Sequence, residues 1–281
     1  MNIFSILQSP DDGTPIGPDL LSEGGIKYEM TKSGVLLLDS CNSRSSDIAY
    51  KSVMFKKWDS IVNERIKYYT GKQSVAGLLA NWSYRSIRRF NERGREWILD
   101  IGCGDGAHLI HLKDRSTYIG LDRNIKRLEI LKHKYPEATV IYGDAASLPF
   151  RSGSLKHVFS CNAFEHLWYL KDTVVDLFRC TDTHGTLVIV VPTEGGLWSI
   201  GRRILSKPHF QKMYPEIDFE FISHVEHCNQ ANQIIRSLET FFHVKKQFKP
   251  TRIPSVIMNV FVELHCQRRD NSCLLRISEN Q

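Results

Sequence analysis

The stretch that decides the fold runs from Trp97 to Gly106 and reads Trp-Ile-Leu-Asp-Ile-Gly-Cys-Gly-Asp-Gly. Its first five residues are mainly apolar, which is typical of a buried strand, and glycines follow at alternate positions. Glycine permits a tight turn from strand to helix and lets a ligand approach the backbone where a Cβ would clash. A dinucleotide-binding loop has the spacing G-x-G-x-x-G, so the spacing found here argues against a dinucleotide.

Short apolar strands alternate with helices beyond this stretch, which is typical of a parallel sheet covered on both faces. We therefore predict an α/β fold: a seven-stranded, mostly parallel, Rossmann-like sheet with helices on both faces, a small N-terminal β module and a helical cap. Strands are predicted at 97–101, 117–121, 139–142, 157–161, 186–191, 244–248 and 259–266, and helices at about 105–113, 124–134, 170–180 and 230–241.

Acidic and polar side chains follow three of the predicted strands. Asp122 ends the second strand, where a carboxylate can accept hydrogen bonds from two ribose hydroxyls. Asp144 follows the third strand and is placed to receive an adenine amino group, and a polar cluster at 160–167 follows the fourth. Open α/β sheets bind ligands at the carboxyl ends of their strands, so we expect these groups to share one site.

Together, residues 100–106, 120–122, 143–150 and 164–167 make the chain resemble a class I S-adenosylmethionine-dependent methyltransferase over about residues 95–268. The resemblance implies an enzyme with S-adenosyl-L-methionine as cofactor. It also implies that the glycine loop holds the amino acid part of the cofactor, that the acidic residues hold ribose and adenine, and that the methionine part lies near Asn162. The cofactor-binding residues expected on this basis are Asp100, Gly102, Cys103, Gly104, Asp122, Arg123, Asp144, Ala145 and Asn162.

A long connection follows the fifth predicted strand. It spans residues 193–229, whereas connections of this kind usually have two to six residues, so we expect a functional lid over the methyl acceptor. The stretch resembles a bacterial subgroup of these methyltransferases. The lid residues expected to contact the acceptor are Trp198, Arg202, Arg203, His209, Tyr214 and Phe219.

Three histidines are candidates for catalysis. His166 follows the fourth strand and could act as a general base, because an unperturbed histidine titrates near neutral pH, or could only shape the pocket. His224 and His227 could orient the acceptor, or could simply cap and pack the next helix. We expect no metal site.

The N-terminal residues 1–39 form a separate unit in this prediction. They are rich in turn-forming residues and resemble a small zinc-ribbon module, but the segment Ser9-Pro-Asp-Asp12 stands where such a module has a C-P-x-C pair, and 1–39 contain neither cysteine nor histidine. We expect either a zinc-free relic or an unrelated β appendage that does not touch the methyl donor. Residues 40–94 are predicted to form a linker and helical cap, and 269–281 a tail.

Composition limits the function. The chain has 281 residues, is 42% apolar and carries a formal net charge of +6, and its seven cysteines form no C-x-x-C pair. We expect a cytoplasmic protein without a membrane span. Arg85, Arg88, Arg89 and Arg93 could form one basic helix face for nucleic acid, or only a solvated face.

The leading hypothesis is methyl transfer to an oxygen, or less favoured a nitrogen, of a small molecule or glycan. The alternatives are an RNA-modifying methyltransferase and a catalytically silent cofactor-binding partner subunit.

Overall fold

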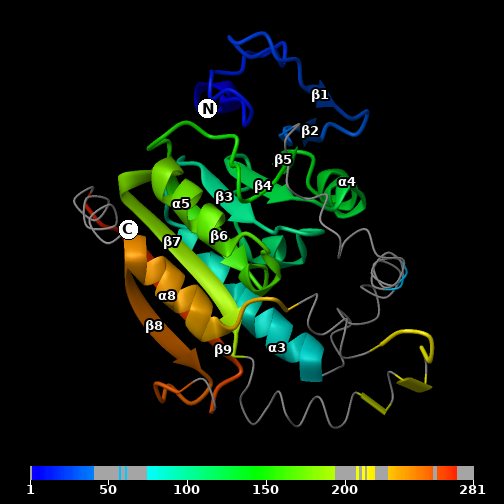
Figure 1. The fold of residues 1–281 in the computed structure, drawn as a ribbon, viewed down its shortest axis with the longest axis vertical. Coiled ribbons are helices and arrows are strands. Elements are labelled where there is room, and N and C mark those ends of the chain that lie inside the picture. The colour runs from blue at the N-terminus through cyan, green and yellow to red at the C-terminus, as the bar shows by residue number, and fades with distance from the viewer. Residues whose placement is uncertain are drawn as a thin grey trace.

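The computed structural model describes residues 2–40, 57, 61, 75–193, 207–208, 211–212, 214–218, 227–255 and 258–270. Its centre is a nine-stranded sheet with the order β1-β2-β5-β4-β3-β6-β7-β9-β8 (Figure 1). Within the described residues, no helix is both long enough and apolar enough to cross a bilayer.

Five parallel strands form the middle of the sheet, and two antiparallel strands complete one side. The strands are β3 (Ile98–Ile101), β4 (Tyr118–Asp122), β5 (Thr139–Tyr142), β6 (Leu155–Cys161), β7 (Thr181–Pro192), β8 (Phe242–Lys249) and β9 (Phe261–Arg268). Strand β9 runs antiparallel to β7 and to β8. These seven strands confirm the predicted Rossmann-like α/β class.

The N-terminal β module, which the sequence predicted as a separate unit, adds two strands to this sheet. Strand β1 (Glu29–Met30) pairs antiparallel with β2 (Leu36–Leu37), and β2 pairs in parallel with β5. Figure 1 shows the module, in blue, beside β4 and β5. The predicted count of seven strands is therefore too low, because the edge of β5 offers unpaired backbone groups and the module covers that edge.

The module also lacks a core of its own among the described residues. Leu7, Ile16 and Leu38 are buried in the same apolar cluster as the central strands. The turn at Ser9 is held by hydrogen bonds: the hydroxyls of Ser9 and Tyr28 lie 2.8 Å apart, and Tyr28 donates to Asp11 Oδ2 at 2.8 Å. The division of the chain at residues 39, 94 and 268 stays a prediction.

Helices cover both faces of the sheet, as predicted. Apolar side chains of α5 and α8 pack on one face, and those of η3, η4 and α4 pack on the other. The segment predicted as a helix at 105–113 is only a short 3-10 turn, because Gly106 has a left-handed backbone at its start. The helices are η1 (Ile3–Ser5), α3 (Val75–Tyr84), η3 (Arg85–Phe90), η4 (Ala107–His111), α4 (Ile125–Lys134), η5 (Phe164–His166), α5 (Leu170–Cys180) and α8 (Ala231–Phe241).

Candidate active site

The glycine loop joins β3 to η4 at the carboxyl edge of the sheet. Gly102, Gly104 and Gly106 all have positive φ angles, of 72°, 53° and 68°. A Cβ on Gly102 would lie 2.3 Å from the Cβ of Ala163, so the loop can pack against the segment after β6 only because residue 102 has no side chain. Among the described residues, a Cβ on Gly104 would meet nothing closer than Arg127 Cδ, at 4.0 Å. The backbone at Gly104 is therefore open to a ligand.

Asp122, at the end of β4, fastens this loop. Its Oδ2 accepts a hydrogen bond from the Gly104 amide at 2.9 Å, and its Oδ1 accepts one from the Asn124 amide at 2.8 Å. Burial raises the pKa of Asp122, and the two backbone hydrogen bonds oppose that rise. Each carboxylate oxygen can accept a further hydrogen bond, so the group fits a ribose diol.

Asp100 lies deeper, at the end of β3. Its Oδ2 is 2.6 Å from His108 Nε2 and accepts a hydrogen bond from the Tyr118 hydroxyl at 2.5 Å. Its Oδ1 is buried and has no hydrogen-bond partner among the described residues. A buried carboxylate oxygen without a donor is costly, which favours a ligand amino group as its missing partner.

Asp144, which follows β5, belongs to a chain of charged side chains that the sequence did not predict. Arg123 Nη1 lies 3.3 Å from Asp144 Oδ2, and Arg123 Nη2 lies 3.5 Å from Asp39 Oδ2. Asp144 Oδ1 also accepts a hydrogen bond from the Ala146 amide at 2.9 Å. Asp39 of the N-terminal module is thus linked through Arg123 to the place expected for adenine, and the expectation that the module does not touch the methyl donor stays a prediction.

Asn162, after β6, has a left-handed backbone with a φ of 53°. Its amide donates to the Val190 carbonyl at 2.9 Å, and its side-chain nitrogen lies 3.5 Å from Ser83 Oγ on α3. Non-glycine residues with positive φ are uncommon and cluster at ligand sites. The contacts with Val190 and Ser83 hold Asn162 at the sheet edge, against β7 and the helical cap.

Two other predicted cofactor residues face the core. Cys103 is buried, and a Cβ on Gly120 would lie 2.8 Å from its sulfur, so its thiol packs over β4. Burial raises the pKa of Cys103 well above its ordinary value, with the nearby carboxylates of Asp122 and Asp100 adding to the rise. Ala145 is also buried in the core. These residues can line the site through their backbone only.

Two of the three candidate histidines lie together. The rings of His166 and His227 have centroids 4.8 Å apart, and His166 Nε2 lies 3.7 Å from Glu165 Oε1. The segment that carries His227 is held on η5, because the amide of Asn229 donates to the Glu165 carbonyl at 3.1 Å. His224 lies outside the described residues.

Most of the predicted lid also lies outside the described residues. Only short parts of 193–229 are described, and of the expected acceptor contacts only Tyr214 is among them. The other five, Trp198, Arg202, Arg203, His209 and Phe219, are not. The lid stays a prediction.

The four arginines of the predicted basic helix face are dispersed. Arg93 lies beyond the end of η3 and donates to three backbone carbonyls. Arg89 pairs with Glu263 on β9, and Arg88 lies 3.2 Å from a histidine of η4. The prediction of one continuous basic face is wrong, because helix η3 ends at residue 90 and the side chains pair with different elements.

Sequence reasoning missed Asp39 and Glu263. Asp39 follows the apolar run 34–38, which is the same pattern of strand and then acid that singled out Asp122 and Asp144. Glu263 is a carboxylate inside a predicted apolar strand, a signal for a buried charge with partners. Neither signal identifies the partner, which comes from a distant part of the chain.

Comparison with known proteins agrees with this geometry. Residues 99–189 match a family described as a methyltransferase domain. A protein of Mycolicibacterium smegmatis described as a probable S-adenosylmethionine-dependent methyltransferase is 30% identical over 134 residues, which cover 44% of this chain and 51% of that protein. The demethylmenaquinone methyltransferase of Thermotoga maritima is 30% identical over 117 residues, which cover 41% of this chain and 51% of the enzyme. The chain spans about half the length of the curated relatives it matches.

Solved structures show the same fold. A SAM-dependent methyltransferase of Thermotoga maritima aligns with a TM-score of 0.51 at 16% identity, over 77% of this chain and 100% of that one. A TehB-like SAM-dependent methyltransferase of Corynebacterium glutamicum aligns with a TM-score of 0.50 at 16% identity, over 76% and 100%.

The fold and the loop at its carboxyl edge define a nucleotide-binding class of α/β enzymes. Within that class, residues 99–189 match the methyltransferase domain family, and the fold is that of class I, Rossmann-like S-adenosylmethionine-dependent methyltransferases.

Proposed function

We propose that this protein transfers the methyl group of S-adenosylmethionine to an oxygen, or less favoured a nitrogen, of a small molecule or glycan. The observation that carries the proposal is the carboxylate of Asp122, which fastens the open backbone of Gly104 and keeps acceptor capacity for a ribose diol. Asp100 Oδ1, which has no hydrogen-bond partner among the described residues, supports a cofactor amino group nearby.

The cofactor supplies a methyl group already activated by a sulfonium. The protein therefore has to align the acceptor with the methyl group and to exclude water, and most of the catalysis comes from that alignment. Asn162 and Ser83 lie where the methionine part is expected, so the helical cap closes this end of the site. The connection 193–229 would cover the acceptor.

An acceptor hydroxyl must lose a proton during transfer. His166 and His227 are the candidate bases, because their rings are in contact beside Glu165 after β6. A neutral imidazole can accept the proton that the acceptor hydroxyl loses.

The first test is cofactor binding. Calorimetry should show saturable binding of S-adenosylhomocysteine and none of NAD. Preference for NAD over S-adenosylhomocysteine would contradict the proposal.

The second test follows the methyl group. The protein is incubated with methyl-labelled S-adenosylmethionine and separate pools of hydroxylated small molecules, glycans and bulk RNA. We expect label in the small-molecule or glycan pool, and a loss of transfer of at least about tenfold in His166→Ala and His227→Ala. His133→Ala, an exposed histidine on α4, is the matched control and should retain full transfer. Label in RNA alone would support the RNA-modifying alternative, and binding without transfer to any pool would support the silent subunit.

A further inference from the structure

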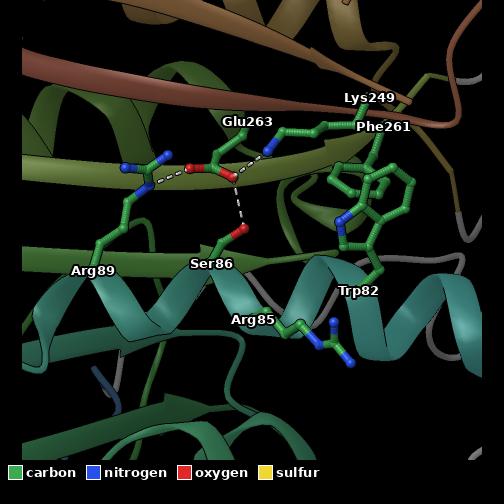
Figure 2. Close-up of a pocket in the computed structure, with 7 residues that line it drawn as sticks. All are labelled: Trp82, Arg85, Ser86, Arg89, Lys249, Phe261 and Glu263. Atoms are coloured by element: carbon green, nitrogen blue, oxygen red, sulfur yellow. Dashed lines mark hydrogen bonds and ion pairs between the residues drawn. The ribbon is translucent and has the colours of Figure 1, made fainter. Parts of the chain in front are cut away.

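A cavity of about 210 Å³ lies between the α3–η3 helical segment and the β8–β9 hairpin. It is bounded by charged side chains on one side and by an aromatic pair on the other, as Figure 2 shows. The residues that line it are Trp82, Arg85, Ser86, Arg89, Lys249, Phe261 and Glu263.

The carboxylate of Glu263 is fully engaged at the base of this cavity. Its Oε1 accepts a hydrogen bond from Arg89 Nε at 2.5 Å and lies 2.8 Å from His265 Nε2, and its Oε2 accepts one from the Ser86 hydroxyl at 2.8 Å. Burial raises the pKa of Glu263, but hydrogen bonds from His265, Ser86 and Arg89 outweigh that rise and lower the pKa to about 2. Glu263 is therefore ionised at neutral pH, and its charge is already compensated.

Among the described residues that line the cavity, positive charges outnumber negative ones. Lys249 Nζ lies 4.0 Å from Glu263 Oε2, beyond hydrogen-bond distance, and the side chain is 27% exposed. Arg89 keeps 44% of its side chain exposed, and Arg85 extends away from the carboxylate in Figure 2. One carboxylate thus faces two nearby cations, with a third at the rim. Such an excess attracts an anion.

The other wall is aromatic. Trp82 and Phe261 form an edge-to-face pair with ring centroids 5.2 Å apart and planes at 80°. Such walls bind the apolar or planar part of a small ligand, while a few charged groups fix its orientation. The cavity therefore fits a small organic anion better than a bare ion.

The cavity also lies beside the proposed methyl-transfer site. Trp82 directly precedes Ser83, whose hydroxyl lies 3.5 Å from the side-chain nitrogen of Asn162. Phe261 pairs with Pro192, at the carboxyl end of β7. Trp82 and Ser83 are consecutive residues of α3, so the cavity and the expected methionine part of the cofactor lie along adjacent faces of the same helical turn.

We propose that this cavity binds the anionic group, a carboxylate or a phosphate, of the small organic acceptor that the enzyme methylates. The identification of the ligand as the methyl acceptor rests on the proposed function, whereas the anion site itself rests on the cavity alone. Lys249 and Arg89 provide the positive charge, and Glu263 holds Arg89 in place through its short ion pair.

The test uses the full chain and three probes of one size: phenyl phosphate, benzoate and neutral phenol. Calorimetry should show saturable binding of at least one anion and none of phenol, and the stronger anion identifies a phosphate or a carboxylate site. Lys249→Met should weaken binding at least about tenfold, consistent with the loss of a charge-assisted contact.

Lys245→Met is the matched control. Lys245 lies four residues from Lys249 on β8 and on the same side of the strand. The substitution therefore removes the same charge roughly 13 Å from the cavity rim. The affinity of the Lys245→Met protein for the anionic probe should equal that of the wild type.

Three outcomes would overturn the anion site: no saturable binding of either anion, equal binding of phenol, or equal weakening by Lys249→Met and Lys245→Met. Affinity for S-adenosylhomocysteine is measured on the same samples and should not change in Lys249→Met. If the wild type did not bind S-adenosylhomocysteine, the proposed function would be refuted, whereas the anion site would be unaffected.

Discussion

Replacing Asp122 with alanine removes the carboxylate expected to hold the ribose of the cofactor. In the structure this carboxylate accepts two backbone hydrogen bonds, from Gly104 at 2.9 Å and from Asn124 at 2.8 Å. The change therefore acts on the ligand and on the loop that receives it.

The magnitude follows from the number of acceptors lost. A hydrogen bond to a charged group contributes about 1.5 to 3 kcal/mol, so two ribose hydroxyls account for about 3 to 6 kcal/mol. This corresponds to a loss of S-adenosylhomocysteine affinity of about 10² to 10⁴. Asp122→Asn should weaken binding less than Asp122→Ala, because the amide keeps one acceptor oxygen.

Calorimetry measures the affinity, and thermal unfolding without ligand measures damage to the loop. Asp114→Ala removes the same charge from an exposed turn, where Asp114 accepts a hydrogen bond from the Ser116 amide, and should leave the affinity unchanged. If a folded Asp122→Ala protein bound S-adenosylhomocysteine within threefold of wild type, the assignment of the ribose to Asp122 would be wrong.

Three further predictions concern the glutamate of the cavity, the glycine loop and the N-terminal module. Glu263 has a folded pKa of about 2 against an ordinary 4.5, so its contribution is complete above pH 4.5 and is lost as the pH falls toward 2. Urea denaturation should show that Glu263→Gln lowers the unfolding free energy by about 3 kcal/mol at pH 7, and that the gap to wild type narrows to about 2 kcal/mol at pH 3.5. Gly102→Ala should destabilise the fold by about 2 to 4 kcal/mol, through its positive φ and a Cβ 2.3 Å from a neighbouring side chain. In Gly153→Ala, where φ is 65° and the added Cβ would meet no non-neighbouring atom of the described residues within 4 Å, denaturation should show only the backbone cost of about 1 to 2 kcal/mol. Asp39→Asn should weaken S-adenosylhomocysteine binding about threefold, because it releases one of the two carboxylates that hold Arg123; an unchanged dissociation constant would show that the module only packs against the sheet.

Local patterns predicted the central part of the molecule. Alternating apolar strands and helices after residue 96 fixed the parallel sheet, because such strands are buried on both faces and leave no other arrangement for their apolar runs. The glycines at 102, 104 and 106 predicted the loop, since their positive φ angles are a local property of the backbone. The positions of Asp122 and Asp144 follow from the same logic, because both lie at the carboxyl end of a strand.

Contacts between distant segments were decided only by the tertiary structure. The sequence placed the N-terminal 39 residues in a separate unit, whereas β2 pairs with β5 and brings Asp39 to Arg123, across 84 positions of the chain. Edge pairing of this kind depends on backbone groups that nearly every residue carries, so the pattern of side chains does not predict it.

The cavity could not be predicted either, because it too is formed by segments that lie far apart in the sequence. Sequence alone determined that an α/β methyltransferase fold would place polar groups at one edge of its sheet. It could not determine that Arg89 of η3 and Glu263 of β9 would meet, because an ion pair depends on distance in space, and 174 residues separate the two along the chain.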